Sequence, residues 1–139
     1  MCGPARERLA WAWVDVFGLV GLGVAAVWLP WPWVVLCGVV PLCEELVFRS
    51  GLQETLLRRG WSGWAAIGLT ALVFTVLHGL LRSWTLAWGV ALPALWLGWV
   101  YHRSRARSGP VMAWRQCVAW HAGFNSIYWV WVQRAGLSA

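Results

Sequence analysis

The sequence predicts an all-α fold: a polytopic transmembrane bundle of about five helices. The 139 residues are 60% hydrophobic and only 12% charged, more apolar surface than a soluble domain of this size can bury. The 15 tryptophans favour the boundary between lipid and water. Five apolar stretches follow one another along the chain, each close to the roughly 20 residues that cross a bilayer. We therefore interpret residues 1–139 as one membrane domain.

The first two apolar stretches are separated by a turn that contains two prolines. The first covers residues 9–29 and includes Asp15, which lies near enough to its start to reach the interface. The second covers residues 33–57. We expect this second helix to be kinked, or to start afresh, near Pro41, because proline removes a backbone hydrogen-bond donor.

Three further stretches complete the predicted bundle. They cover residues 61–81, 84–101 and 111–132. The arginine-rich segment at 102–110 is expected to form a basic loop between the last two helices.

The distribution of arginine predicts the orientation in the membrane. In a five-span arrangement one side carries Arg6, Arg8, Arg58, Arg59 and the cluster at 103–107, whereas the other side carries Arg82 and Arg134. The positive-inside rule then places the N-terminus in the cytoplasm and the C-terminus outside. Because the arginines form short clusters between apolar runs, we interpret the net charge of +6 as a topology signal and expect no nucleic-acid partner.

Charged residues inside the apolar stretches are the candidates for function, because each costs roughly 2.5–3.5 kcal/mol on insertion scales. The first group is Glu44, Glu45 and Arg49. Glu45 and Arg49 are four residues apart, so they share a helix face and can pair. Glu44 points about 100° away and has no partner at helical spacing. A carboxylate that is buried without a partner suits the role of a general base.

The other two groups combine histidine with an aromatic or amide residue. His78 follows Phe74 by four residues near the end of its predicted helix, and Asn125 follows His121 by the same spacing. Histidine and asparagine can donate hydrogen bonds to a developing oxyanion. The alternatives are a satisfied polar histidine and hydrogen bonding between helices. Taken together, however, the three groups supply what peptide hydrolysis requires: a base for water and donors for the tetrahedral intermediate.

These groups resemble the three motifs of the CPBP family of intramembrane endopeptidases (CaaX proteases and bacteriocin-processing enzymes, also called ABI). The motifs EExxxR, FxxxH and HxxxN occur in the family's order as Glu44-Glu45-x-x-x-Arg49, Phe74-x-x-x-His78 and His121-x-x-x-Asn125. The resemblance covers roughly residues 41–129. It implies a glutamic intramembrane protease without a cofactor. Glu44 and His78 would activate water, His121 and Asn125 would stabilise the oxyanion, and Glu45 and Arg49 would organise the site.

The resemblance also implies the partners and the location. The substrate would be a membrane-anchored or tail-bearing protein in the lipid bilayer, because small bacterial members are associated with C-terminal sorting tails. We accordingly expect a bacterial inner-membrane protein. The chain is shorter than typical members, which leaves open its oligomeric state and whether a partner completes the bundle. In the predicted orientation the site opens towards the non-cytoplasmic side, because His78 lies near the outer end of its helix.

Two alternatives stay open at this point. In the first, the two histidines and a glutamate hold a catalytic zinc ion with water in the fourth position, although no HExxH pattern is present. In the second, the protein is a non-catalytic membrane scaffold or immunity protein that keeps the polar residues for helix packing.

Overall fold

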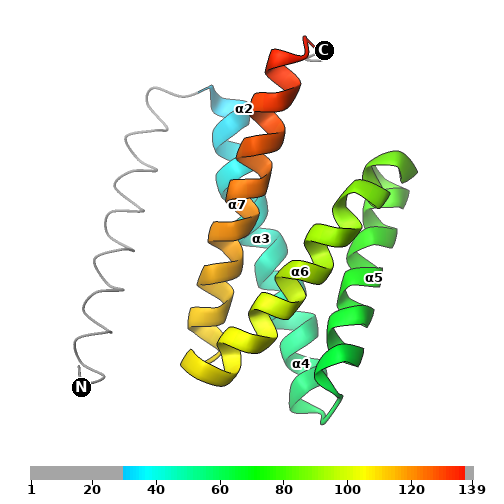
Figure 1. Cartoon of the computed structure of the whole chain (residues 1–139), viewed down its shortest axis with the longest axis vertical. Coiled ribbons are helices and arrows are strands. Elements are labelled where there is room, and N and C mark those ends of the chain that lie inside the picture. Colours follow the sequence, from blue (N-terminus) through cyan, green and yellow to red (C-terminus); the bar gives the residue numbers. More distant parts are fainter. Residues whose placement is uncertain (1–29, 137–139) are drawn as a thin grey trace, which may run out of the picture.

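The described part of the chain is all helical (Figure 1). The structure is a computed structural model, and it describes residues 30–136. The predicted first span at residues 9–29, with Asp15, lies outside the described residues. The helical segments are α2 (Trp31–Val34), η1 (Val35–Val39), α3 (Val40–Glu45), η2 (Leu46–Gln53), α4 (Glu54–Arg58), α5 (Gly63–Leu81), α6 (Trp84–Ser108) and α7 (Pro110–Arg134).

The segments α2 to α4 join into one helix of 28 residues, Trp31–Arg58. It corresponds to the second predicted span, and because it is the first helix of the described residues, we call it the first helix. Its segments η1 and η2 are π-helical, a wider form that occurs frequently at functional sites. The π-helical turn η1 gives way to α-helix at Val40, directly before Pro41, and the backbone stays in the right-handed helical region there. The chain thus passes Pro41 without leaving the helix, and the kink expected near Pro41 stays a prediction.

Within residues 30–136, two helices, the first helix and α5, are long and apolar enough to cross a bilayer. Helices α6 and α7 have 25 residues each, which is more than the roughly 20 residues that a span needs. Many large apolar side chains point away from the bundle, among them Trp64, Leu72, Leu80, Trp88, Leu92 and Ile127. An apolar exterior of this extent fits contact with lipid. The count of five spans stays a prediction.

Local sequence signals set the ends of the later helices. Ser62 and Ser83 cap α5 and α6, because each hydroxyl accepts a hydrogen bond from a backbone N–H three residues ahead. Gly109, with φ at +83°, ends α6 in a conformation that favours glycine. Pro110 then begins α7, where its missing N–H has no cost.

The prediction of a basic loop at residues 102–110 is wrong for most of this range, because α6 continues to Ser108. The physical reason is a contact with the first helix. The guanidinium group of Arg105 donates to both carboxylate oxygens of Glu54, and the Tyr101 hydroxyl donates to the same carboxylate across 3.0 Å. Two residues four apart on α6 therefore bind one acid, which fixes this turn as helix.

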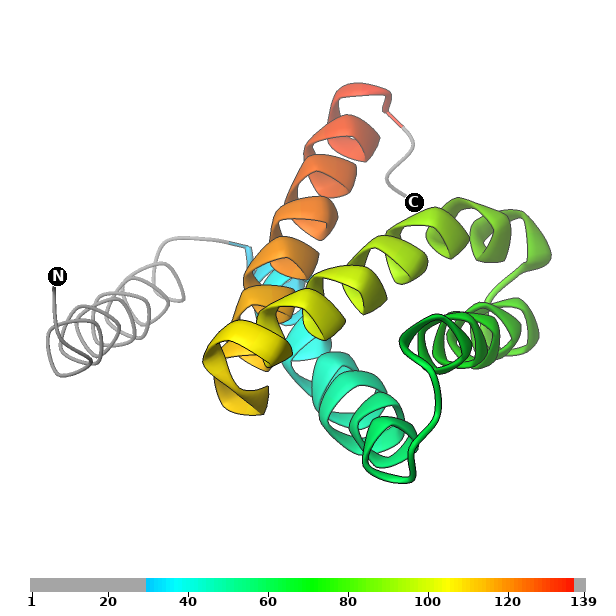
Figure 2. The ribbon, with the colours of Figure 1, turned by 60° about the horizontal axis from the view of Figure 1, so that its bottom comes forward.

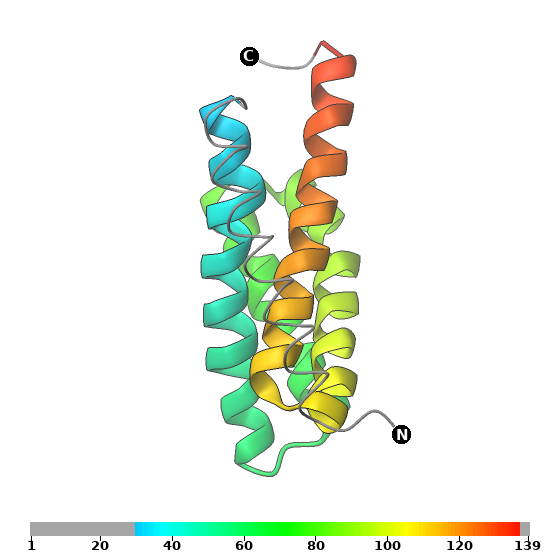
Figure 3. The same ribbon diagram turned by 90° about the vertical axis from the view of Figure 1, so that its left-hand side faces the viewer.

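The helices pack through small and apolar side chains. One cluster joins α6 to α7 through Leu97, Tyr101 and Cys117, and another joins α5 to α6 through Phe74 and Ala94. Helices α6 and α7 meet at the turn between them and diverge towards their far ends (Figures 1 and 2). The connections α4–α5 and α6–α7 lie together at one end of the bundle (Figure 3).

These two connections define a basic end of the described bundle. It carries Arg58, Arg59, Arg103, Arg105 and Arg107, whereas the opposite end carries Arg82 and Arg134. These arginines therefore lie at two opposite ends of the described bundle. Which end faces the cytoplasm stays a prediction.

Candidate active site

The side chains of the three motifs meet near the middle of the bundle, although they come from three separate helices. Glu44 is on α3, His78 on α5 and His121 on α7. One oxygen of the Glu44 carboxylate lies 3.8 Å from Nε2 of His78, and the other lies 3.5 Å from Nε2 of His121. The Glu44 side chain is 26% exposed, so the carboxylate borders open space and is not sealed in the core.

That open space is a cavity of about 400 Å³. It is lined by Leu36, Val40, Glu44, Phe74, His78, Arg82, Leu86, Gly89, Val90, Pro93, Ala94, Leu97, His121, Phe124, Asn125 and Tyr128. Every long helix contributes to this lining. Besides Glu44 and the two histidines, the one charged side chain among the described lining residues is Arg82, in the turn between α5 and α6. The lining extends from the motif residues towards this turn and includes none of the arginines at the basic end.

Hydrogen bonding determines which nitrogen of His121 faces Glu44. Its Nδ1 lies 2.8 Å from Oε1 of Glu45. The Glu45 carboxylate also accepts from Arg49, so it acts as an acceptor and Nδ1–H is the donor. Nε2 of His121 is thereby directed to Glu44. This is the arrangement in which a carboxylate behind a histidine fixes its ring orientation.

His78 is oriented by its own helix. Its Nδ1 lies 3.0 Å from the backbone carbonyl of Phe74, which can only accept, so Nδ1–H is again the donor and Nε2 faces Glu44. The Phe74 ring lies against the imidazole, with 4.2 Å between the ring centroids. Phe74 also packs edge-on against Phe48. The aromatic residue of the FxxxH pattern thus holds the histidine in place through both its backbone and its ring.

Asn125 binds the π-helical part of the first helix. Its Nδ2 donates to the carbonyl of Leu36 across 2.8 Å. In η1 the N–H of Val40 bonds to the carbonyl of Val35, five residues back. With the same spacing of five residues, the partner of the Leu36 carbonyl would be the backbone nitrogen of Pro41. This nitrogen carries no hydrogen and cannot donate. Asn125 supplies the donor that Pro41 lacks, and its second N–H remains for another acceptor.

A fully buried polar network lies behind the histidine. Arg49 donates to Glu45 across 3.0 Å, to Gln53 across 3.4 Å and to the carbonyl of Ala94 across 3.0 Å. Gln53 donates to the carbonyl of Gly98 across 2.8 Å. Glu45, Arg49 and Gln53 are all 0% exposed. The expected pair of Glu45 and Arg49 is present, and it is part of a row that ties the first helix to the backbone of α6.

Two residues near the motif side chains, Gln53 and Arg82, were not predicted as site residues from the sequence. Gln53 follows Arg49 by four residues and Glu45 by eight, so the helical spacing that revealed the pair also pointed to Gln53. Arg82 was interpreted only as a topology signal. Nothing in the spacing connects Arg82 to the motifs except its position four residues after His78.

Among residues 30–136, no group of three or more histidine, cysteine, aspartate or glutamate side chains has an arrangement that could hold a metal ion. The metal content of the purified protein and its activity after chelation test the zinc alternative.

Comparison with known proteins gives one match. The model of a family described as type II CAAX prenyl endopeptidase Rce1-like matches residues 26–127. This range includes all three motifs and every lining residue of the cavity except Tyr128. No curated protein and no solved structure matches the chain.

Proposed function

Because the chain belongs to the family of Rce1-like type II CAAX prenyl endopeptidases, we propose that it is an intramembrane endopeptidase of the glutamic type. Its substrate is a protein with a membrane anchor or a C-terminal tail. The enzyme hydrolyses a peptide bond near that anchor or tail.

The observation that supports this proposal is the convergence of Glu44, His78 and His121 from three helices upon one cavity. Separations of 3.5 and 3.8 Å are longer than direct hydrogen bonds but suit a water molecule held between the groups. Glu44 takes a proton from this water, with Nε2 of His78 as a second acceptor. The resulting hydroxide attacks the carbonyl carbon of the substrate.

The oxyanion that forms is bound by Asn125 and His121. Asn125 contributes the N–H that it does not donate to Leu36. Since Nδ1–H of His121 donates to Glu45, Nε2 can donate to the oxyanion only when the ring carries both protons. Collapse of the intermediate breaks the C–N bond, and the proton held by Glu44 passes to the leaving amine.

The cavity lining supports entry of the substrate from the end that carries Arg82. This end is non-cytoplasmic in the predicted orientation of a bacterial inner-membrane protein, with the C-terminus outside. Lipid bilayer and a tail-bearing protein are then the only partners that the reaction needs, and no cofactor is required.

The experiment that tests the function compares protein C-termini in cells that express the wild-type chain or Glu44→Gln. Mass spectrometry of the membrane fraction identifies C-termini that appear only with the wild type. A set of truncated membrane-anchored proteins supports the endopeptidase. Identical C-termini in both strains favour the scaffold or immunity alternative. The zinc-dependent protease, which uses the same residues, is distinguished by metal content.

A further inference from the structure

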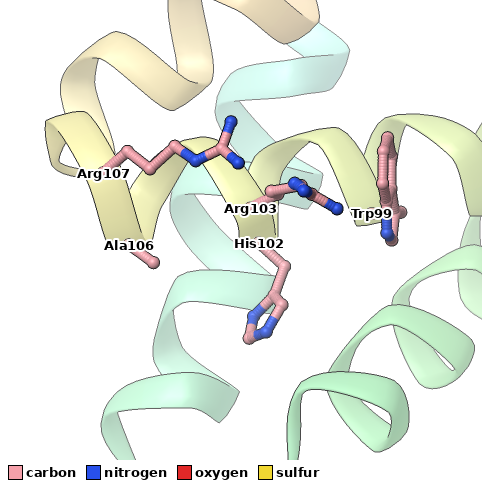
Figure 4. Close-up of a pocket in the computed structure, with 5 residues that line it drawn as sticks. All are labelled: Trp99, His102, Arg103, Ala106 and Arg107. Carbon is pink, nitrogen blue, oxygen red and sulfur yellow. The ribbon is translucent and has the colours of Figure 1, made fainter.

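A second hollow, of about 340 Å³, lies on the last turns of α6 (Figure 4). It is lined by Trp99, His102, Arg103, Ala106 and Arg107, none of which lines the cavity that holds Glu44. The hollow is therefore a separate feature of the protein, at the basic end of the bundle. Figure 4 shows both arginine side chains extending along the helix in the direction of Trp99.

The hollow carries positive charge that the described residues do not neutralise. The acidic residues of the described part are Glu44, Glu45 and Glu54, and each is engaged elsewhere. Arg105, between the two arginines of the hollow, turns inward to Glu54. Arg103 and Arg107 form no ion pair with residues 30–136. Their charge is available to an anion from outside.

An aromatic ring forms one wall of the hollow, beside the charge. The guanidinium group of Arg103 lies 5.3 Å from the centroid of the Trp99 ring, a cation–π contact. The ring of His102 packs directly over the backbone of Gly63, where a β-carbon would lie 2.6 Å from it. Two tryptophans lie beside this contact: Trp61, just before α5, is 47% exposed, and Trp64, in its first turn, is 75% exposed. Exposed tryptophans at this level indicate the membrane interface.

An apolar stripe leads from the hollow along α6. Trp88, Leu92, Leu95 and Trp96 are exposed, and with Trp99 they recur at spacings of three and four, so they share one helix face with Arg103 and Arg107. The helix face thus changes from apolar to cationic at Trp99. A ligand that fits both parts has an anionic head and long apolar chains.

We propose that this hollow binds an anionic glycerophospholipid. Arg103 and Arg107 bind the phosphate, Trp99 packs against the glycerol region, and an acyl chain lies along the apolar stripe. In the predicted orientation the lipid belongs to the cytoplasmic leaflet, where anionic lipids attract juxtamembrane basic residues. The proposal is independent of the protease chemistry.

The test uses the purified full chain in detergent micelles that contain equal amounts of phosphatidylglycerol and phosphatidylcholine with the same acyl chains. Native mass spectrometry counts the lipids that stay bound. We expect wild type to retain phosphatidylglycerol preferentially. The double variant Arg103→Gln/Arg107→Gln is expected to lose about 25-fold of this preference, since each such arginine contributes roughly fivefold.

The matched control is Arg59→Gln/Arg134→Gln, which also removes two exposed arginines, but outside the hollow. It should keep the preference. If the control variant loses the phosphatidylglycerol preference to the same extent, general surface charge explains the binding and the proposed site is wrong. The proposal is also wrong if the wild-type protein shows no preference for phosphatidylglycerol. A competition experiment on the wild-type protein does not require any variant to fold. Inorganic phosphate is added at the same concentration as the lipid. If it displaces the lipid, the hollow is a site for free phosphate and the lipid proposal is overturned.

Discussion

His121 donates a hydrogen bond from Nδ1 to Oε1 of Glu45 across 2.8 Å. The adjacent residue, Glu44, faces the opposite nitrogen of the same ring. Two neighbouring glutamates on one helix thus face the two nitrogens of one imidazole ring, Glu45 at Nδ1 and Glu44 at Nε2. One of them is buried with Arg49 and the other borders the cavity. This difference in surroundings leads to different expectations for the two acids.

Glu44→Gln should abolish activity and leave the fold intact. The amide keeps the size of the side chain but cannot take a proton from water. Loss of a general base lowers the rate by roughly 10²–10⁴-fold. The measurement is cleavage of an identified substrate by reconstituted protein, with thermal unfolding as the check on folding. Cleavage near the wild-type rate would contradict the glutamic mechanism.

Arg49→Ala should destabilise the protein as well as inactivate it. Removal of Arg49 leaves the Glu45 carboxylate buried without its ion-pair partner, at a cost of roughly 3–5 kcal/mol. Arg58→Ala is the control, because Arg58 also pairs with a glutamate four residues earlier but is 68% exposed; its loss should cost less than about 1 kcal/mol. Thermal unfolding in detergent measures both. Equal stability of the two variants would mean that the buried network does not hold the helices together.

Pro41→Ala should impair catalysis without loss of stability. The new backbone N–H at position 41 can bond to the Leu36 carbonyl, which releases Asn125 from its fixed position. Displacement of an oxyanion donor should lower kcat at least about tenfold, towards the 10²–10³-fold loss seen when such a donor is removed. Pro110→Ala, the same change at the start of α7 and outside the cavity lining, is the control and should retain kcat. If Pro41→Ala keeps the wild-type kcat and KM, Asn125 does not depend on Pro41.

Chelators should leave the activity intact, and the purified protein should contain well under one zinc ion per chain. The glutamic mechanism needs only water, Glu44 and the two histidines. Elemental analysis and activity after dialysis against a strong chelator provide the measurement. A stoichiometric ion with bonds of about 2.0–2.1 Å to histidine nitrogen would replace the glutamic mechanism by the zinc alternative.

Cysteine labelling can test the orientation. In a background that lacks the four native cysteines, single cysteines are placed at Ser108 and Gln133, which are exposed at opposite ends of the bundle. An impermeant maleimide added to intact cells should label the cysteine at 133 and spare the one at 108. The reverse pattern would invert the topology and with it the side from which the cavity opens.

The parts of the site that were predictable from the sequence are those that depend on positions within one helix. The pair of Glu45 and Arg49 and the shared face of His121 and Asn125 follow from a spacing of four residues. The backbone partners could not be predicted in this way. The carbonyls of Leu36 and Ala94 accept hydrogen bonds from side chains 89 and 45 residues away, and such contacts depend on how the helices pack.

The fold was predictable to a similar extent. Apolar length places α5 and α7 within a few residues of their observed ends. The end of α6 was predicted seven residues too early, because Arg103 to Arg107 resemble an exposed basic loop in sequence. Their helical conformation depends on Glu54, which lies 51 residues before Arg105. The π-helical turns of the first helix left no recognisable pattern in the hydrophobic residues.

The two ties between the first helix and α6 have a mechanical consequence. Glu54 holds Arg105 and Tyr101 at the basic end, and Arg49 holds the backbone of Ala94 nearer the middle. Together these ties resist sliding and rotation of α6 along half of its length. The turn at Arg82 lies beyond both ties, where α6 and α7 diverge (Figure 1). We therefore expect any widening of the cavity for a peptide to occur at the α5–α6 turn, beyond Ala94, while the basic end remains still.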